Sequence, residues 1–171
     1  MPNHLSTLGI IHTAISVLAL IIAIFALLRY GKIDPATGYG RLYILLTVIT
    51  CITGFPIMKT GHFTPGHYLA IIILILLPLG IYVHSLRIFG KLADYIQVIF
   101  LSTTIFLSCV PAIVETFTRL PISHPLAEDA NAPIIQKGLG ALVLLYFVGV
   151  IYQLVKLKAQ KRSARKTEFN H

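Results

Sequence analysis

The stretch LGIIHTAISVLALIIAIFALL, residues Leu8–Leu28, contains no Asp, Glu, Lys or Arg. An α-helix rises about 1.5 Å per residue, so this stretch would cover roughly 31 Å, near the thickness of the hydrocarbon core of a bilayer. No basic cluster precedes it, and it is longer than the apolar segment of a cleavable signal peptide. We therefore interpret Leu8–Leu28 as a first transmembrane helix.

The composition of the whole chain supports the same interpretation. Of the 171 residues, 56% are hydrophobic and 12% are charged, and the mean hydropathy is +0.83. A water-soluble domain has about a quarter of its residues charged. Because so many apolar side chains cannot be buried in one small core, lipid must be the solvent for a large part of the surface.

Four more apolar segments follow, separated by short stretches rich in Gly, Pro and charge. The predicted fold is all-α, a polytopic membrane helical bundle with five transmembrane helices. Residues 1–158 form the transmembrane domain, and residues 159–171 form a basic tail. The predicted spans are Leu8–Leu28, Leu42–Met58, Gly66–Leu86, Ala93–Thr116 and Ile134–Leu157.

The basic residues predict the orientation, because cytoplasmic loops carry an excess of Lys and Arg. With the N-terminus outside and the C-terminus cytoplasmic, three basic residues face outward: Lys59, Arg119 and Lys137. The other eleven face inward: Arg29, Lys32, Arg41, Arg87, Lys91, Lys156, Lys158, Lys161, Arg162, Arg165 and Lys166. The predicted location is the bacterial cytoplasmic (inner) membrane, as a multi-pass protein.

The net charge of +8 owes much to the basic tail, which follows an apolar run. Such a tail indicates contact with anionic lipid headgroups rather than with nucleic acid. A partner membrane protein is also compatible with the pattern. The two cysteines, Cys51 and Cys109, lie inside apolar runs without a CxxC motif, which argues against a disulfide framework or a thiolate metal site.

Ionisable side chains gather near the predicted outer face. Counting along each helix places four of them at one level, and two loop histidines could approach the same level. Such groups in a membrane usually point into the bundle or into a wet cavity. The four helical residues are His12, His67, Glu115 and Lys137, and the loop residues are His62 and His124.

Two kinds of cofactor site are compatible with this cluster. His12 and His67 could be the axial ligands of a haem b placed between facing helices. Alternatively, His62, His124 and Glu115 could join these histidines around a transition metal ion, because imidazole and carboxylate groups bind such ions. Either site would serve electron transfer.

Two other interpretations stay open. Glu115 and Lys137 could form an ion pair at the mouth of a polar track for protons or small solutes, continued by Gln97, Thr104 and Ser108. The same polar residues could instead hold the helices together in a cofactor-free packing or accessory subunit. The sequence has no nucleophile triad, phosphate loop or GxGxxG motif, so it indicates no hydrolase, kinase or dinucleotide-binding class.

The stretch GRLYILLTVITCITGFPI, residues 40–57, followed by GHFTPGHYLAIIILILLPLG, residues 61–80, resembles small bacterial multi-pass families of predicted membrane proteins of unknown function. About 40 residues carry this resemblance, at positions Gly40, Arg41, Leu42, Tyr43, Thr53, Gly54, Phe63 and His67. It implies the architecture and no activity. The outer histidines add a looser likeness to small membrane cytochromes b, which implies haem binding by His12 and His67.

Overall fold

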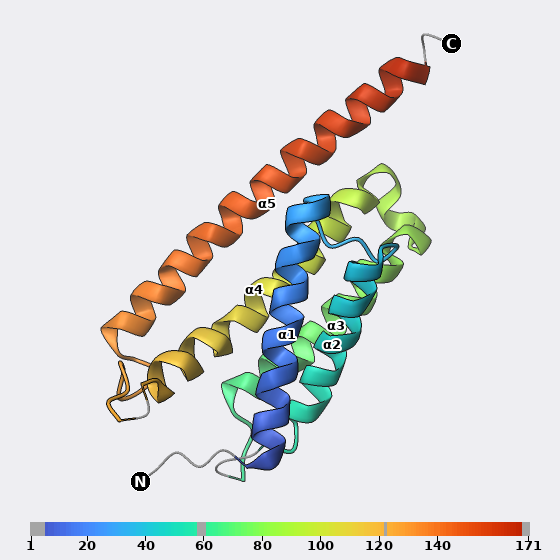
Figure 1. Cartoon of the computed structure of the whole chain (residues 1–171). Helices are drawn as coiled ribbons and strands as arrows, with labels where there is room; N and C mark the ends of the chain where they lie inside the picture. Colours follow the sequence, from blue (N-terminus) through green and yellow to red (C-terminus); the bar gives the residue numbers. More distant parts are fainter. Residues whose placement is uncertain (1–5, 58–60, 122, 169–171) are drawn as a thin grey trace.

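The computed structural model describes residues 6–57, 61–121 and 123–168, and this part of the chain contains helices and no strand. The helices run up and down, so that the first helix begins and the last helix ends at opposite ends of the molecule (Figure 1). They are α1 (Thr7–Tyr30), α2 (Gly38–Gly54), α3 (Pro65–Tyr82), α4 (Ala93–Arg119) and α5 (Pro133–Glu168), with two 3₁₀ segments, η1 (Val83–Ser85) and η2 (Arg87–Leu92).

The helix ends follow from capping residues. The hydroxyl of Ser6 accepts a hydrogen bond from the amide of Gly9, 3.1 Å away, and Thr37 does the same for Gly40 at the start of α2. Helix α1 ends at Gly31, which has a φ of 75° and donates its N–H to Leu27.

The observed helix boundaries differ from the bounds of the predicted spans in three places. Helix α2 begins and ends four residues earlier than Leu42–Met58, because Thr37 caps it and it stops at Gly54, two residues before Pro56. The third helix ends at Tyr82 and gives way to 3₁₀ turns. Helix α5 continues to Glu168 as one helix, across the predicted boundary at residue 158, because Ala, Lys, Gln and Arg favour helix.

Four of these helical segments are long and apolar enough to cross a membrane: Thr7–Tyr30, Pro65–Ser85, Arg87–Arg119 and Pro133–Ser163. Helix α2 is shorter, with 17 residues. The division into a transmembrane domain and a tail stays a prediction.

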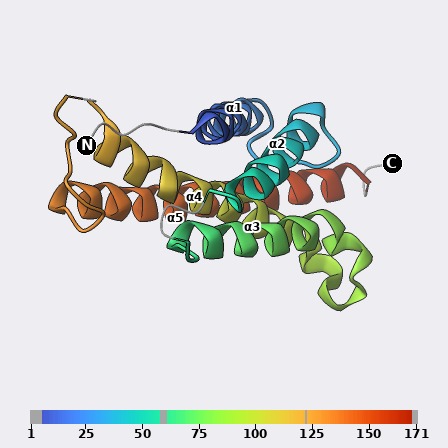
Figure 2. The ribbon, with the colours of Figure 1, turned by 90° about the horizontal axis from the view of Figure 1, so that it is seen from below.

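Helix α4 is the centre of the bundle. It contacts α1 and α3 on one side and α5 on another, while α2 contacts α1 and α3. Among the described elements, α5 contacts α4 alone. In Figure 1, α5 runs at an angle to α1 and α2, and its last turns extend beyond the other helices; Figure 2 shows the bundle from below.

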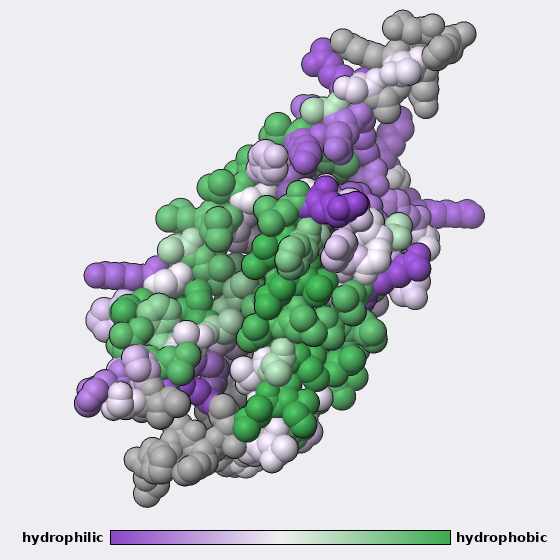
Figure 3. Space-filling model, viewed as in Figure 1, coloured by the Kyte–Doolittle hydropathy of each residue, from purple (hydrophilic) through white to green (hydrophobic). Residues whose placement is uncertain are grey.

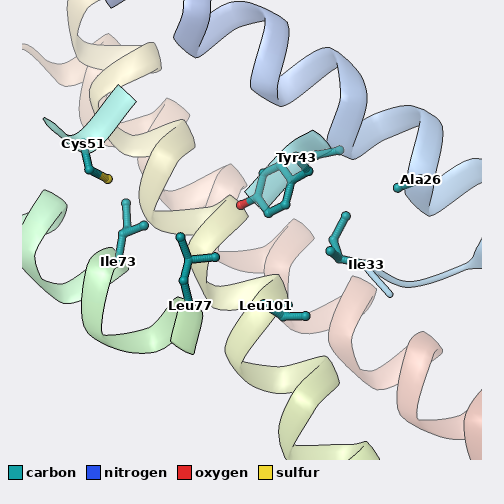
Figure 4. Close-up of a cluster of buried hydrophobic side chains, with 8 residues drawn as sticks. Ala26, Ile33, Tyr43, Cys51, Ile73, Leu77 and Leu101 are labelled. Carbon is teal, nitrogen blue, oxygen red and sulfur yellow. The ribbon is translucent and has the colours of Figure 1, made fainter. Parts of the chain in front are cut away.

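The buried core is small, whereas the apolar surface is large. The core cluster joins α1, α2, α3 and α4 around Tyr43 (Figure 4) and consists of Ala23, Ala26, Ile33, Tyr43, Cys51, Ile73, Leu77 and Leu101. Large apolar side chains cover the outside of α1 and α5, including Leu28, Leu144 and Val148 at 65% exposure or more. Figure 3 shows this apolar surface between polar ends. It is the surface expected of an integral membrane protein, whose solvent is lipid.

Polar side chains inside the bundle bond across helix interfaces. The hydroxyls of Tyr43 and Thr104 lie 2.8 Å apart, and the amide of Gln97 donates to the carbonyl of Gly80 over 3.0 Å. Two further pairs join α4 to α5, Ser102 with Gln153 and Thr103 with Tyr146. Such bonds hold helices together in lipid, where apolar contact alone gains little.

Candidate functional site at the histidine end

His12 and His67 both lie at one end of the bundle, here called the histidine end, where α1 and α3 begin and α2 ends. His12 contacts Thr53 and Gly54, in the last turn of α2, and His67 contacts the next residue, Phe55. The two histidines therefore lie at the same end of the molecule, as their positions along the helices predict.

The hydrogen bonds of His12 define which of its nitrogens is basic. Its Nδ1 lies 3.1 Å from the hydroxyl oxygen of Thr53, and this hydroxyl donates its own proton to the carbonyl of Ile49, 2.8 Å away. The Thr53 oxygen must then accept a proton from Nδ1. Neutral His12 is therefore the Nδ1–H tautomer, and Nε2 carries the basic lone pair.

Gly54 provides the space for this imidazole. A Cβ atom at position 54 would lie 3.2 Å from Cε1 of His12, closer than most real Cβ contacts. The close approach of α1 to α2 at this end thus depends on the absence of a side chain at Gly54.

His67 has the opposite tautomer and a structural task. It is 4% exposed, and its Nδ1 accepts the backbone N–H of Thr64 over 3.0 Å. Nε2 lies 3.2 Å from the carbonyl oxygen of Phe55 and must donate to it. His67 thereby caps the start of α3 and ties it to the end of α2, in the manner of a capping box.

The hydrogen bonds of His67 are unfavourable for the predicted haem. An axial ligand offers a nitrogen lone pair to the iron. The lone pair of His67 is on Nδ1, which accepts from the backbone of Thr64, so binding iron would break the cap of α3. The pairing of His12 with His67 around a haem stays a prediction, and the hydrogen bonds of His67 count against it.

Glu115 belongs to the same end. It forms an ion pair with Arg119, one helical turn further along α4, and lies close enough to His12 to interact with it electrostatically. Lys137 is exposed on α5 and lines a shallow pocket together with Glu128 and Asp129. The predicted ion pair between Glu115 and Lys137 stays a prediction.

The predicted metal ligands do not converge. His62 and His124 are both exposed, His62 just before α3 and His124 in the loop between α4 and α5. Within residues 6–57, 61–121 and 123–168, no three His, Cys, Asp or Glu side chains come together as a metal-binding group. The set His62, His124 and Glu115 therefore gains no support from the geometry.

One polar group near His12 lacks a protein partner. The hydroxyl oxygen of Thr50 is buried and has no hydrogen bond to any described residue. Thr50 lies one turn before Thr53 on α2, and its backbone also approaches the His12 ring. A buried hydroxyl in this situation usually bonds to a water or a small ligand.

The sequence did not reveal a set of interactions at the opposite end, here called the basic end. Asp94 lies 2.7 Å from His84 and also pairs with Lys161 of α5. In the turn between α1 and α2, Asp34 pairs with Lys32 at 3.2 Å. Burial alone would raise the pKa of Asp34, but the amide of Ala36 and the ammonium of Lys32 together lower it below its ordinary value.

Comparison with known proteins does not assign the chain to a family. No family model, curated protein or solved structure matches this chain. The resemblances to multi-pass families of unknown function and to cytochromes b therefore stay predictions, and what is shown is a helical, apolar protein compatible with a membrane.

Proposed function

We propose that the chain crosses the membrane five times, with the histidine end outside and the basic end in the cytoplasm. The charges support this orientation. Among the described side chains, the histidine end has two basic residues, Arg119 and Lys137, and three acidic ones, Glu115, Glu128 and Asp129. The basic end has nine Lys and Arg residues and two acidic ones, Asp34 and Asp94.

Because α2 covers only about 25 Å, the bilayer must thin slightly around it.

Reporter fusions test the orientation. We expect green fluorescent protein fused after His171 to fluoresce and alkaline phosphatase fused there to be inactive, because the first works in the cytoplasm and the second outside. A tag placed before Met1 should be cut by protease added to intact spheroplasts. Finding both termini in one compartment would contradict five crossings.

We further propose that this membrane protein binds a proton at His12 and uses it in proton or small-solute transport. The observation that carries this proposal is the contact of His12 Nδ1 with the Thr53 hydroxyl, whose own proton goes to the carbonyl of Ile49. This contact orients the imidazole and leaves Nε2 as the nitrogen that would take up a proton. The carboxylate of Glu115, itself paired with Arg119, lies close enough to the His12 imidazole to interact with it electrostatically.

Polar groups continue from this site into the bundle. The buried hydroxyl of Thr50 comes first, followed by the hydrogen-bonded hydroxyls of Tyr43 and Thr104. Ser108 lies one turn from Thr104 and donates to its carbonyl. These groups supply positions that a proton or a polar solute would require along a path through the bundle.

The second candidate is a cofactor-free packing or accessory subunit. It is favoured by the interhelical bonds of Tyr43, Gln97 and Ser102, each of which already has a protein partner. Under this alternative His12 contributes only to the contact between α1 and α2.

Proteoliposomes containing a pH-sensitive dye separate these candidates. We expect the wild-type protein to admit protons under an imposed pH gradient, and His12→Gln to reduce this rate at least tenfold by removing the basic nitrogen. His124→Gln is the matched control, because His124 is an exposed loop histidine between α4 and α5, and it should retain the wild-type rate.

Three results would overturn the proposal. A wild-type protein without proton movement would favour the packing subunit. An unchanged rate in His12→Gln would remove His12 from the pathway. A Soret absorption band or a bound metal in the purified protein, lost in His12→Ala, would instead establish a cofactor site.

A further inference from the structure

The basic end carries a charge that its own carboxylates do not neutralise. Its nine described basic residues come from α1, α2, α5, the turn between α1 and α2, and the connection between α3 and α4: Arg29, Lys32, Arg41, Arg87, Lys91, Lys156, Lys158, Lys161 and Arg162. Asp34 is occupied by Lys32, and Asp94 by His84 and Lys161. Seven of the nine have no carboxylate partner among the described residues.

Several tyrosines with exposed rings lie near this end. Tyr30 and Tyr39 lie with ring centroids 6.3 Å apart, and both are partly exposed. Tyr82 and Tyr152 are more than 60% exposed. Exposed tyrosines beside basic residues are typical of the interface between hydrocarbon and headgroups, where the apolar ring lies in hydrocarbon and the hydroxyl lies among the headgroups.

Helix α5 is fixed against this end by two lysines. The ammonium of Lys161 pairs with Asp94 and lies 4.8 Å from the ring centre of Tyr95. The ammonium of Lys156 lies over Gly31, 2.9 Å from where a Cβ would be, and so next to the carboxyl end of α1. A cation at this position is stabilised by the helix dipole.

Two other basic residues of the same helix segment have no such contact. Lys158 and Arg162 are exposed and lie four residues apart, on one face of α5. In Figure 3 the polar end of α5 stands beyond the apolar surface of the molecule. These two cations are therefore carried on the exposed side of a helix that Lys161 joins to Asp94 of α4.

We propose that the basic end is a binding surface for anionic phospholipid headgroups, with Lys158 and Arg162 as its principal phosphate contacts. The tyrosines identify the partner as lipid rather than nucleic acid, because they place these cations at a membrane surface. Juxtamembrane Lys and Arg attract anionic lipid in this way. This proposal goes beyond the function of the histidine end and is independent of proton movement.

The full-length protein in a neutral detergent can be titrated with short-chain phosphatidylglycerol and, separately, with short-chain phosphatidylcholine, with bound lipid counted by native mass spectrometry. We expect preferential binding of phosphatidylglycerol that weakens as salt is raised. Each removed charge should weaken binding roughly fivefold, so Lys158→Gln/Arg162→Gln should bind about 25-fold more weakly.

Lys137→Gln is the matched control, because Lys137 is an exposed cation at the other end of α5, and it should bind like the wild type. Equal binding of both lipids would overturn the proposal. So would equal weakening by Lys137→Gln, or tighter binding of a single-stranded oligonucleotide than of phosphatidylglycerol. Retained helical circular dichroism in each variant ensures that weaker binding is not caused by unfolding.

Discussion

Gly40→Ala is expected to lower the free energy of unfolding by about 1–3 kcal/mol, the range found when a packed interior is overfilled. A Cβ atom at position 40 would lie 1.9 Å from the carbonyl oxygen of Asp34 and 2.6 Å from its carbon. These are backbone atoms, which cannot swing away as the end of a side chain can. The turn between α1 and α2 would have to move, and with it the two hydrogen bonds that the Asp34 carbonyl accepts from Thr37.

Gly38→Ala provides the control in the same turn of α2. A Cβ at Gly38 has nothing within 4 Å. Both variants gain about the same helix propensity, up to ~1 kcal/mol, so the difference between them isolates the clash with Asp34. Unfolding in mixed detergent micelles, followed by circular dichroism, measures both. Equal free energies of unfolding for the two variants would contradict the prediction, because they would show that the backbone at Asp34 moves aside without cost.

The long apolar runs were sufficient to predict most of the fold. The first helix and the fourth were predicted within a few residues of their observed ends, because a long, predominantly apolar run satisfies its backbone hydrogen bonds in lipid by forming a helix. The start of α2 was missed because Gly38 and Gly40 suggest a loop, whereas the cap by Thr37 and the close contact at Asp34 require glycine inside the first turn.

The site was predictable in position and not in chemistry. Helical rise alone brings His12 and His67 to one end of the bundle. Their roles depend on single hydrogen bonds, to Thr53 and to the backbone of Thr64, which the sequence does not specify. The spacing Thr64-x-x-His67 was a usable signal, since it matches a capping box with imidazole in place of a carboxylate.

The interactions at the basic end required the three-dimensional fold. Asp94 and Lys161 are 67 positions apart, and neither local sequence shows that the packing of α5 on α4 brings the two side chains together. The exposed tyrosines and Lys158 could be recognised as interfacial from the sequence, but not as parts of one surface.

Tyr43→Ala is expected to be the most destabilising single substitution in the bundle, by about 3–5 kcal/mol, the usual cost of removing a buried aromatic ring. Tyr43 is fully buried, and its hydroxyl bonds to Thr104, which is equally buried. Its ring belongs to the core cluster with Ile33, Leu77 and Leu101, drawn from four parts of the chain (Figure 4). Lipid would not fill the resulting space, so the contacts of all these neighbours are lost together.

Two variants divide this effect into its parts. Tyr43→Phe keeps the ring and removes only the donor to Thr104, whose own proton already goes to the carbonyl of Leu101, so we expect a loss of about 1 kcal/mol. Tyr68→Ala removes a ring that is 58% exposed on α3 and should cost much less than Tyr43→Ala. Reversible unfolding of the three proteins in the same micelles gives the comparison. Removing a ring at the centre of four converging segments must cost packing. If Tyr43→Ala were as stable as Tyr68→Ala, the helices would therefore not be held together around Tyr43.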